Sequence, residues 1–227
     1  MARLTTNSQE ASIGDLFSSG TSLFVIPFFQ REYRWKADKI KNLLQDILNV
    51  VDGESDKHFL GAIIIHGRRA TPTDPKCFEV IDGQQRMTTI FLFLCALVKS
   101  LAEQGSHEEA ARIARNYLVT GQDFNQSNLR VHSCRQDRAM MRYVIDDLKS
   151  NTDLVGSLSP FNLNALPAHG PTTGAIKNNF NAFKRFFAQE FAQSGIERIR
   201  EIYNAVFESF TLVQIDVLDP TDGPKIF

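Results

Sequence analysis

Residues 77–97, CFEVIDGQQRMTTIFLFLCAL, contain a short apolar strand pattern, a polar turn and the start of the most hydrophobic helix pattern in the chain. The polar turn runs from Asp82 to Arg86 and lies at the edge of what should be the core. A buried polar group without a hydrogen-bond partner costs roughly 1–3 kcal/mol, and an unpaired charge costs more. The turn must therefore satisfy its own polar groups or meet a polar ligand.

The hydrophobic periodicity on both sides of this stretch predicts an α/β (α+β) fold with a mostly helical second half. We expect strands at 22–27, 58–67, 77–82 and 211–218. We expect helices at 8–17, 37–51, 84–104, 107–118, 136–149, 174–194 and 196–209, and a loop at 150–173. These elements divide the chain into a core of residues 1–105 and a helical extension of residues 106–227 that returns its last strand to the sheet.

Composition excludes several classes of protein. A formal net charge of −1 gives no general attraction to polyanions, so any contact with nucleic acid needs a local basic patch. The three cysteines form no C-x-x-C pair and the histidines lack ligand spacing, which argues against zinc and for reduced thiols. Without a signal peptide or an apolar run of about 20 residues, the protein is expected to be cytoplasmic. Its apolar end at Ile226 and Phe227 suggests the N-terminal part of a longer polypeptide.

The strand, the Asp-Gly turn and the following helix have the geometry of an anion site. Gly83 permits a tight turn, and the first N–H groups of the helix lack intrahelical partners at the positive end of its dipole. Arg86 adds a bidentate donor, and Gln84 and Gln85 supply donors and acceptors. Asp82 has two possible roles, either capping the helix or holding Mg²⁺ or a ribose hydroxyl. Neither a P-loop nor a G-x-G-x-x-G motif is present.

A second polar and aromatic cluster occupies residues 26–35, IPFFQREYRW. It contains Gln30, Arg31, Tyr33, Arg34 and Trp35, which is the only tryptophan. One interpretation is an amphipathic loop whose aromatic rings fill the core while its arginines stay in water. The other is a lid that closes over a nucleotide or a flipped base.

Four arginines form a third candidate site, because Arg135, Arg138 and Arg142 repeat with helical spacing just after Arg130. A solvated helix face explains such a pattern. The functional alternative is a patch for DNA phosphates, whose affinity should fall steeply with salt.

Taken together, IPFFQREYRW, HFLGAIIIH and FEVIDGQQRMTTIFLFLCAL resemble the N-terminal domain of GmrSD-type proteins, a family of modification-dependent restriction enzymes and related phage-defence proteins. The likeness continues more weakly through NLRVHSCRQDRAMMRYV, IKNNFNAFKRFF and TLVQIDVLDPTDGPKIF, and so covers nearly the whole chain. Both polar motifs follow the family pattern without departure.

The resemblance implies a ParB/sulfiredoxin-like fold that binds and hydrolyses a nucleoside triphosphate (GTP, ATP or CTP) with Mg²⁺, coupled to cleavage of foreign or modified DNA. In the family, the motif matching Asp82 to Arg86 is tied to the nucleotide site. Our hypothesis therefore gives catalytic roles to Asp82, Gln84, Gln85 and Arg86, with Asp82 orienting Mg²⁺ or a ribose hydroxyl. It assigns nucleotide binding to Gly83 and to the first motif, whose matching residues are Ile26, Pro27, Phe29, Gln30, Arg31, Tyr33 and Trp35.

Two other functions stay open at this point. The same pocket fits a non-catalytic module that recognises modified DNA, or a ParB-like clamp that forms a homodimer with nucleotide. Full-length relatives often carry a C-terminal HNH-type nuclease domain, and this chain has no such motif. We therefore expect an NTPase that does not cut DNA by itself.

Overall fold

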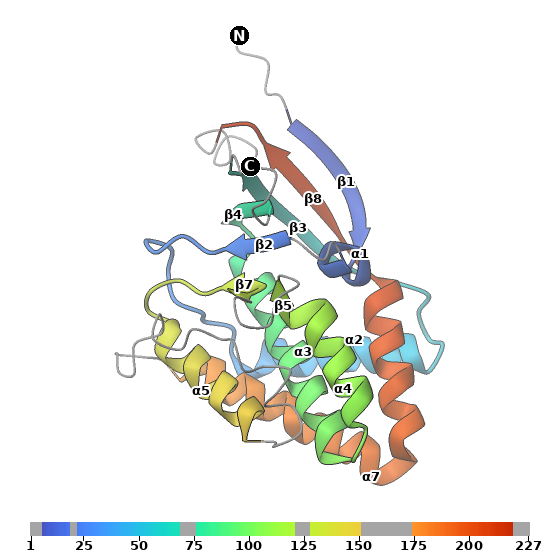
Figure 1. The fold of residues 1–227 in the computed structure, drawn as a ribbon. Helices are drawn as coiled ribbons and strands as arrows, with labels where there is room; N and C mark the ends of the chain where they lie inside the picture. Colours follow the sequence, from blue (N-terminus) through green and yellow to red (C-terminus); the bar gives the residue numbers. More distant parts are fainter. Residues whose placement is uncertain (1–5, 19–21, 69–75, 121–127, 151–173, 220–227) are drawn as a thin grey trace.

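The computed structural model describes residues 6–18, 22–68, 76–120, 128–150 and 174–219, and it places a mixed sheet against a group of helices (Figure 1). The expected α+β class is confirmed. The strands are β1 (Thr6–Ser12), β2 (Ser22–Val25), β3 (His58–Gly67), β4 (Lys76–Asp82), β5 (Val119–Thr120), β6 (Asn128–Leu129), β7 (Val131–His132) and β8 (Phe210–Val217). The helices are α1 (Ile13–Ser18), α2 (Ala37–Val51), α3 (Gln84–Glu103), α4 (His107–Ile113), the π-helical turn η1 (Ala114–Leu118), α5 (Arg138–Lys149) and α7 (Ala175–Ser209).

The main sheet has the order β1-β8-β3-β4-β2-β7. Strand β8 runs parallel to β3 and antiparallel to β1, so the last strand of the described chain lies inside the sheet. Strand β2 is parallel to both β4 and β7. The predicted division at residue 105 stays a prediction, but β8 from the second half completes the sheet of the first.

Helix α3 runs from the sheet down through the centre of the helices, as its all-round apolar middle predicted (Figure 1). Every residue from Met87 to Ala102 is buried. Its length and composition would also suit a membrane span, but 89% of that window is buried inside the protein. Burying a large aliphatic or aromatic side chain contributes about 1.5–3 kcal/mol, so α3 is the main source of core stability and a firm base for the turn that precedes it.

Helix α7 crosses the bottom of α3 and then turns back up to the sheet at Gly195, between the two helices predicted at 174–194 and 196–209 (Figure 1). This glycine has φ 75° and ψ −165°, and it separates two helical halves. Arg198, in the second half, bonds to Glu190 in the first and to Asp52 after α2, and so fixes the bend.

One expectation about local structure was wrong. Residues 6–12 form a strand because they pair with β8, so only 13–17 of the expected helix at 8–17 is helical, and α1 continues to residue 18. The helical conformation expected at 107–118 is confirmed, with an α-helix to residue 113 and a π-helical turn from 114 to 118. The two-residue strands β5, β6 and β7 were not predicted. The loop expected at 150–173 lies outside the described residues except for Ser150, in a turn.

Candidate functional site

The turn between β4 and α3 depends on Gly83. Its φ of 91° lies in the left-handed region, and a Cβ built there would lie 2.6 Å from Cγ2 of Ile63. Glycine is the residue that adopts this conformation without a steric penalty. The tight turn therefore brings the end of β4 directly onto the start of α3, as the sequence predicted.

Asp82 lies exposed at this turn, immediately before the first amides of α3. The first helical bond runs from the Met87 N–H to the Gly83 carbonyl, so the amides of residues 84–86 precede the intrahelical ladder. Among the described residues, no hydrogen bond joins the Asp82 carboxylate to them, which does not support the helix-cap interpretation. The carboxylate is placed where a ligand or cation can reach it.

Two glutamines hold the 26–35 segment against this turn. The Gln85 Oε1 accepts from the Arg34 N–H at 2.7 Å, and its Nε2 donates to the Glu32 carbonyl at 3.2 Å. The Gln30 Nε2 donates to the Ile81 carbonyl at 2.9 Å. Both side chains thus satisfy backbone groups of a neighbouring segment. One role of the polar residues at the edge of the core is therefore to hold the IPFFQREYRW segment in place through hydrogen bonds.

Tyr33 extends this anchoring into the core, where it is 1% exposed. Its hydroxyl lies 2.7 Å from the Thr89 Oγ1 and accepts from the Asn179 Nδ2 at 3.1 Å. The same Nδ2 donates to the Trp35 carbonyl at 2.7 Å. Burial raises the pKa of Tyr33 to about 12, although these bonds oppose the shift. Tyr33 therefore ties the segment to α3 and α7, and it lines no open cavity.

Asp137 forms the third anchor, from the turn before α5. Its Oδ2 accepts from the Tyr33 N–H at 2.8 Å and from the Cys134 thiol at 3.3 Å. Burial raises the pKa of the Asp137 carboxyl above its ordinary value, while the two hydrogen bonds oppose the rise. Burial also raises the pKa of Cys134 to about 11. The carboxylate is thus a structural acceptor for the segment.

Arg86, in the first turn of α3, contacts the neighbouring strand β3. Its Nη1 donates to the Ala62 carbonyl at 2.9 Å, and its guanidinium lies against Gly61, where a Cβ would come within 3.1 Å of Nε. The gap that Arg86 shares with Trp35 has a volume of about 20 Å³, enough for about one water molecule. A nucleotide therefore has no room between Trp35 and Arg86.

The structure separates the four arginines of the candidate DNA patch. Arg130 is 0% exposed, and its guanidinium donates to the carbonyls of Ser22, Asn116 and Val119. Burial lowers its pKa to about 10. The expectation that Arg130 contacts DNA is therefore wrong for this conformation, because Arg130 instead holds β2, η1 and β5 together.

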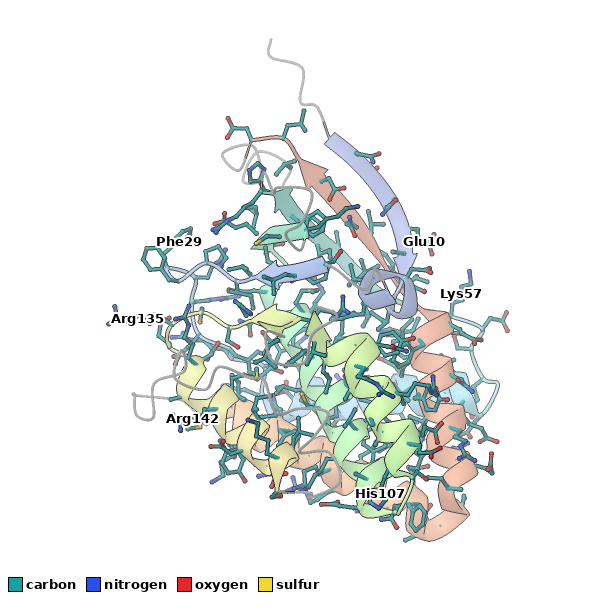
Figure 2. All side chains as sticks on the ribbon, in the orientation of Figure 1. Glu10, Phe29, Lys57, His107, Arg135 and Arg142 are labelled. Carbon is teal, nitrogen blue, oxygen red and sulfur yellow. The ribbon has the colours of Figure 1, made fainter. Side chains whose placement is uncertain are left out.

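The other three arginines lie at or near the surface. Arg135 is exposed in the turn before α5, so it is not on the helix as expected. Arg138 begins the helix and is half-buried, with its Nε 3.5 Å from the Ser133 carbonyl. Arg142 is also half-buried and pairs with Asp146. Figure 2 shows Arg135 and Arg142 on the same margin of the molecule as Phe29.

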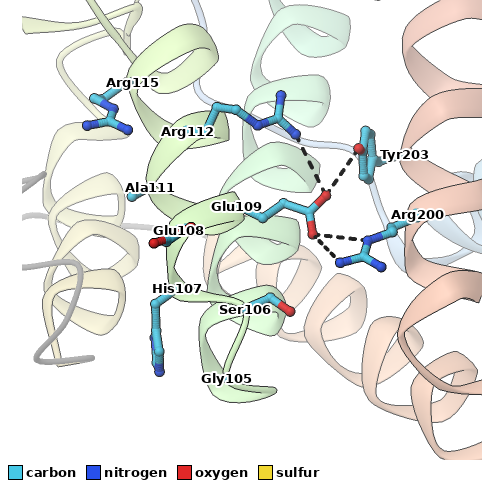
Figure 3. A pocket seen from close by; sticks show the side chains of 10 residues that line it. All are labelled: Gly105, Ser106, His107, Glu108, Glu109, Ala111, Arg112, Arg115, Arg200 and Tyr203. Atoms are coloured by element: carbon cyan, nitrogen blue, oxygen red, sulfur yellow. Dashed lines mark hydrogen bonds and ion pairs between the residues drawn. The ribbon is translucent and has the colours of Figure 1, made fainter.

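A larger hollow, of about 1220 Å³, lies near the other end of α3, between α4 and α7 (Figure 3). Its centre is the Glu109 carboxylate, which accepts from Arg200 Nε at 3.2 Å and from the Tyr203 hydroxyl at 3.2 Å. Arg112 approaches the same carboxylate at 3.7 Å. A 20-residue helix is roughly 30 Å long, so this hollow is remote from the Asp82 turn. Its central charges, on Glu109, Arg112 and Arg200, pair with one another, and the polar motifs of the sequence do not line it.

Sequence reasoning missed the residues that support the site, namely Thr89, Cys134, Asp137 and Asn179. A signal for two of them was present. Asp137 and Asn179 are polar residues inside SCRQDR and IKNNF, which belong to the segments where the family likeness continues. Polar residues in such segments are candidates for contacts with the main motifs.

Comparison with family models identifies the family of the chain. The family model described as "GmrSD restriction endonuclease, N-terminal domain" matches residues 13–227, a range that includes both polar motifs and all four supporting residues. No curated protein matches the chain. The matched range agrees with the likeness drawn from the two motifs.

Proposed function

The chain belongs to the family of GmrSD restriction endonuclease N-terminal domains, and from this membership we propose that it binds and hydrolyses a nucleoside triphosphate at the Asp82–Arg86 turn. It is thus the N-terminal domain of a restriction or phage-defence protein. The observation that carries the proposal is the exposed Asp82 carboxylate beside the left-handed Gly83 at the start of α3. Helix N-termini of this kind favour phosphate groups.

Each residue of the turn has a part in this proposal. The amides at the start of α3 contact phosphate oxygens, and the Arg86 guanidinium, whose Nη1 bonds to Ala62, keeps other N–H donors for a charge-assisted contact. Arg31 is exposed on the adjoining segment and adds positive charge. Gln85 is engaged at both ends of its amide, so Gln84 is the better candidate to orient an attacking water. Such positioning and charge stabilisation are what phosphoryl transfer requires.

Magnesium fits this donor set. Mg²⁺ is usually held by one or two carboxylates together with substrate phosphates, and Asp82 supplies one exposed carboxylate. Among the described residues, no three His, Cys, Asp or Glu side chains gather into a metal site. We therefore propose that the cation arrives with the triphosphate and neutralises its charge, while Asp82 orients it. In the parent protein, DNA cleavage would belong to a C-terminal nuclease domain.

Trp35 provides the test, because it is the only tryptophan and its carbonyl belongs to the anchored segment. We would titrate GTP, ATP and CTP with Mg²⁺ and follow its fluorescence in wild type, Asp82→Asn and Arg86→Ala. We expect saturable quenching for at least one nucleotide, weakened in both variants. Asp82 is exposed, so Asp82→Asn should fold even if Arg86→Ala does not.

Arg115→Ala is the matched control, because Arg115 is an exposed arginine beside the remote hollow of Figure 3. It should bind like wild type. If no nucleotide binds, as judged by fluorescence and calorimetry, the proposal is wrong and the non-catalytic DNA-recognition function becomes the better one. Binding followed by a release of inorganic phosphate that Gln84→Ala abolishes would support hydrolysis.

A further inference from the structure

Two phenylalanines lie at the tip of the 26–35 segment, outside the core. A turn from Pro27 to Gln30 is closed by the Gln30 N–H and the Pro27 carbonyl at 3.0 Å. Phe28 and Phe29 are its central residues and are 68% and 69% exposed. Turn centres are normally Gly, Asn, Asp, Ser or Pro, each of which helps the chain to bend. Packing and turn chemistry therefore do not explain why two large aromatic side chains are here.

The turn that carries these rings is held firmly at its base. The Ile26 N–H donates to the His132 carbonyl at 2.9 Å, and the Gln30 side chain bonds to β4 at the Ile81 carbonyl. The rings contact each other edge to face, with centroids 5.4 Å apart. An aromatic pair on an anchored turn loses little conformational entropy when it binds a partner.

Positive charge flanks the aromatic pair. Arg31 and Arg135 are exposed, and the Cys134 thiol lies 3.7 Å from the Arg31 carbonyl, which brings their two segments together. Figure 2 shows Phe29 and Arg135 on the same margin of the molecule. Of the nearby carboxylates, Glu32 pairs with Arg34 at 3.1 Å and Asp137 is buried.

We propose that this turn, Phe28–Phe29 with Arg31 and Arg135, contacts a DNA strand in which a base stacks on or is wedged aside by the phenylalanines while the arginines hold the flanking phosphates. Charge complementarity favours DNA over an apolar protein partner, because aromatic rings interleaved with arginines match alternating bases and phosphates. Phenylalanine also serves as a wedge between base steps in DNA-bending proteins. The inference rests on the proposed role in a DNA-targeting protein, but not on nucleotide hydrolysis.

The test measures binding of a fluorescein-labelled oligonucleotide of about 20 bases, which exceeds the roughly 4–16 nucleotides of a typical single-strand site. Single strand, duplex and a duplex with one mismatched pair would be compared by anisotropy. Stacking on one ring is worth roughly 1–3 kcal/mol, so Phe28→Ala/Phe29→Ala should weaken binding at least about tenfold. Its salt dependence should stay close to that of wild type, whereas Arg31→Gln/Arg135→Gln should flatten it.

Phe59→Ala is the matched control, because Phe59 is 60% exposed on β3. Lys57, two residues before it, lies on the margin opposite Phe29 in Figure 2. Phe59→Ala should bind DNA like wild type. A 2-aminopurine base in the strand should change its fluorescence with wild type but not with the phenylalanine double variant.

Three outcomes would overturn the inference. One is equal DNA binding by wild type and Phe28→Ala/Phe29→Ala, and a second is an equal loss in Phe59→Ala. The third is no DNA binding by wild type, which would also remove the DNA role of this domain but leave the Trp35 nucleotide titration intact. A dimer in light scattering that only the phenylalanine variant disrupts, with DNA binding unchanged, would assign the turn to a second copy of the chain instead.

Discussion

The two ends of α3 both carry polar clusters, but the clusters are built differently. At the start of the helix, Gln85, Asp137 and Asn179 satisfy backbone groups of the 26–35 segment through buried or half-buried bonds. Beyond its other end, Glu109 and Arg200 pair with each other inside an open hollow (Figure 3). The larger hollow therefore lies at the end where Glu109 and Arg200 already pair. At the end that carries the family motifs, hydrogen bonds hold the segments together, and the gap between Trp35 and Arg86 is small. The size of the cavity and the position of the family motifs therefore direct attention to opposite ends of the helix.

Glycine substitutions at the two ends should give the largest difference. Gly83→Ala must place a Cβ at positive φ and 2.6 Å from Ile63, whereas Gly105 also has positive φ but a Cβ added there would meet no atom within 4 Å. The left-handed conformation costs about 1–2 kcal/mol, and overpacking adds roughly 1–3 kcal/mol. We expect a loss of about 2–5 kcal/mol for Gly83→Ala and about 1–2 kcal/mol for Gly105→Ala in urea unfolding. Equal losses would mean that the β4–α3 turn relaxes as freely as the opposite end.

The sequence predicted the elements that depend on local pattern. Helix α3 was clear because its apolar residues run all round, and the two halves of α7 were predicted as separate helices, on either side of Gly195. The Asp-Gly turn was placed correctly for the same reason, since Gly83 determines its geometry locally.

The remaining features depend on partners far away in the chain. Strand β1 is polar, and its conformation is decided by β8. The role of Gln85 depends on Arg34, 51 residues away, and that of Asp137 on Tyr33, 104 residues away. No single-segment pattern shows such contacts. The arginine spacing was misleading for the same reason, because only the packing shows that Arg130 is inside.

Tyrosine-to-phenylalanine changes at the two ends of α3 should give a moderate difference in the loss of unfolding free energy. Tyr33→Phe removes a hydroxyl shared by Thr89 and Asn179 inside the core, and we expect it to cost about 1–2 kcal/mol of unfolding free energy. Tyr203→Phe removes a half-buried bond to Glu109, which Arg200 still satisfies, so its loss should be smaller. Chemical denaturation of both variants measures the difference. A larger loss in Tyr203→Phe would contradict the view that buried bonds dominate at the start of α3.

The smallest expected effect is a pH dependence of the unfolding free energy that arises near the start of α3. Burial, and secondarily Arg138, lowers the pKa of His132, whose carbonyl anchors Ile26. The unfolded chain then binds the proton more readily, so stability present above the ordinary pKa of 6.5 is lost as the pH falls below it. The raised pKa of Asp137 has the opposite effect, because above pH 3.8 its contribution to stability increases as the pH falls. The quantity to follow is therefore the difference in stability between wild type and His132→Gln. We expect the variant to lose less stability than wild type when urea midpoints are measured at decreasing pH from neutral. Because burial is the main cause of the His132 shift, added salt should leave this difference in stability nearly unchanged, whereas salt should weaken the exposed ion pairs around Arg200. A difference that disappears in salt would mean that the pH dependence at the start of α3 comes from interactions between charges, like the pairing at the other end.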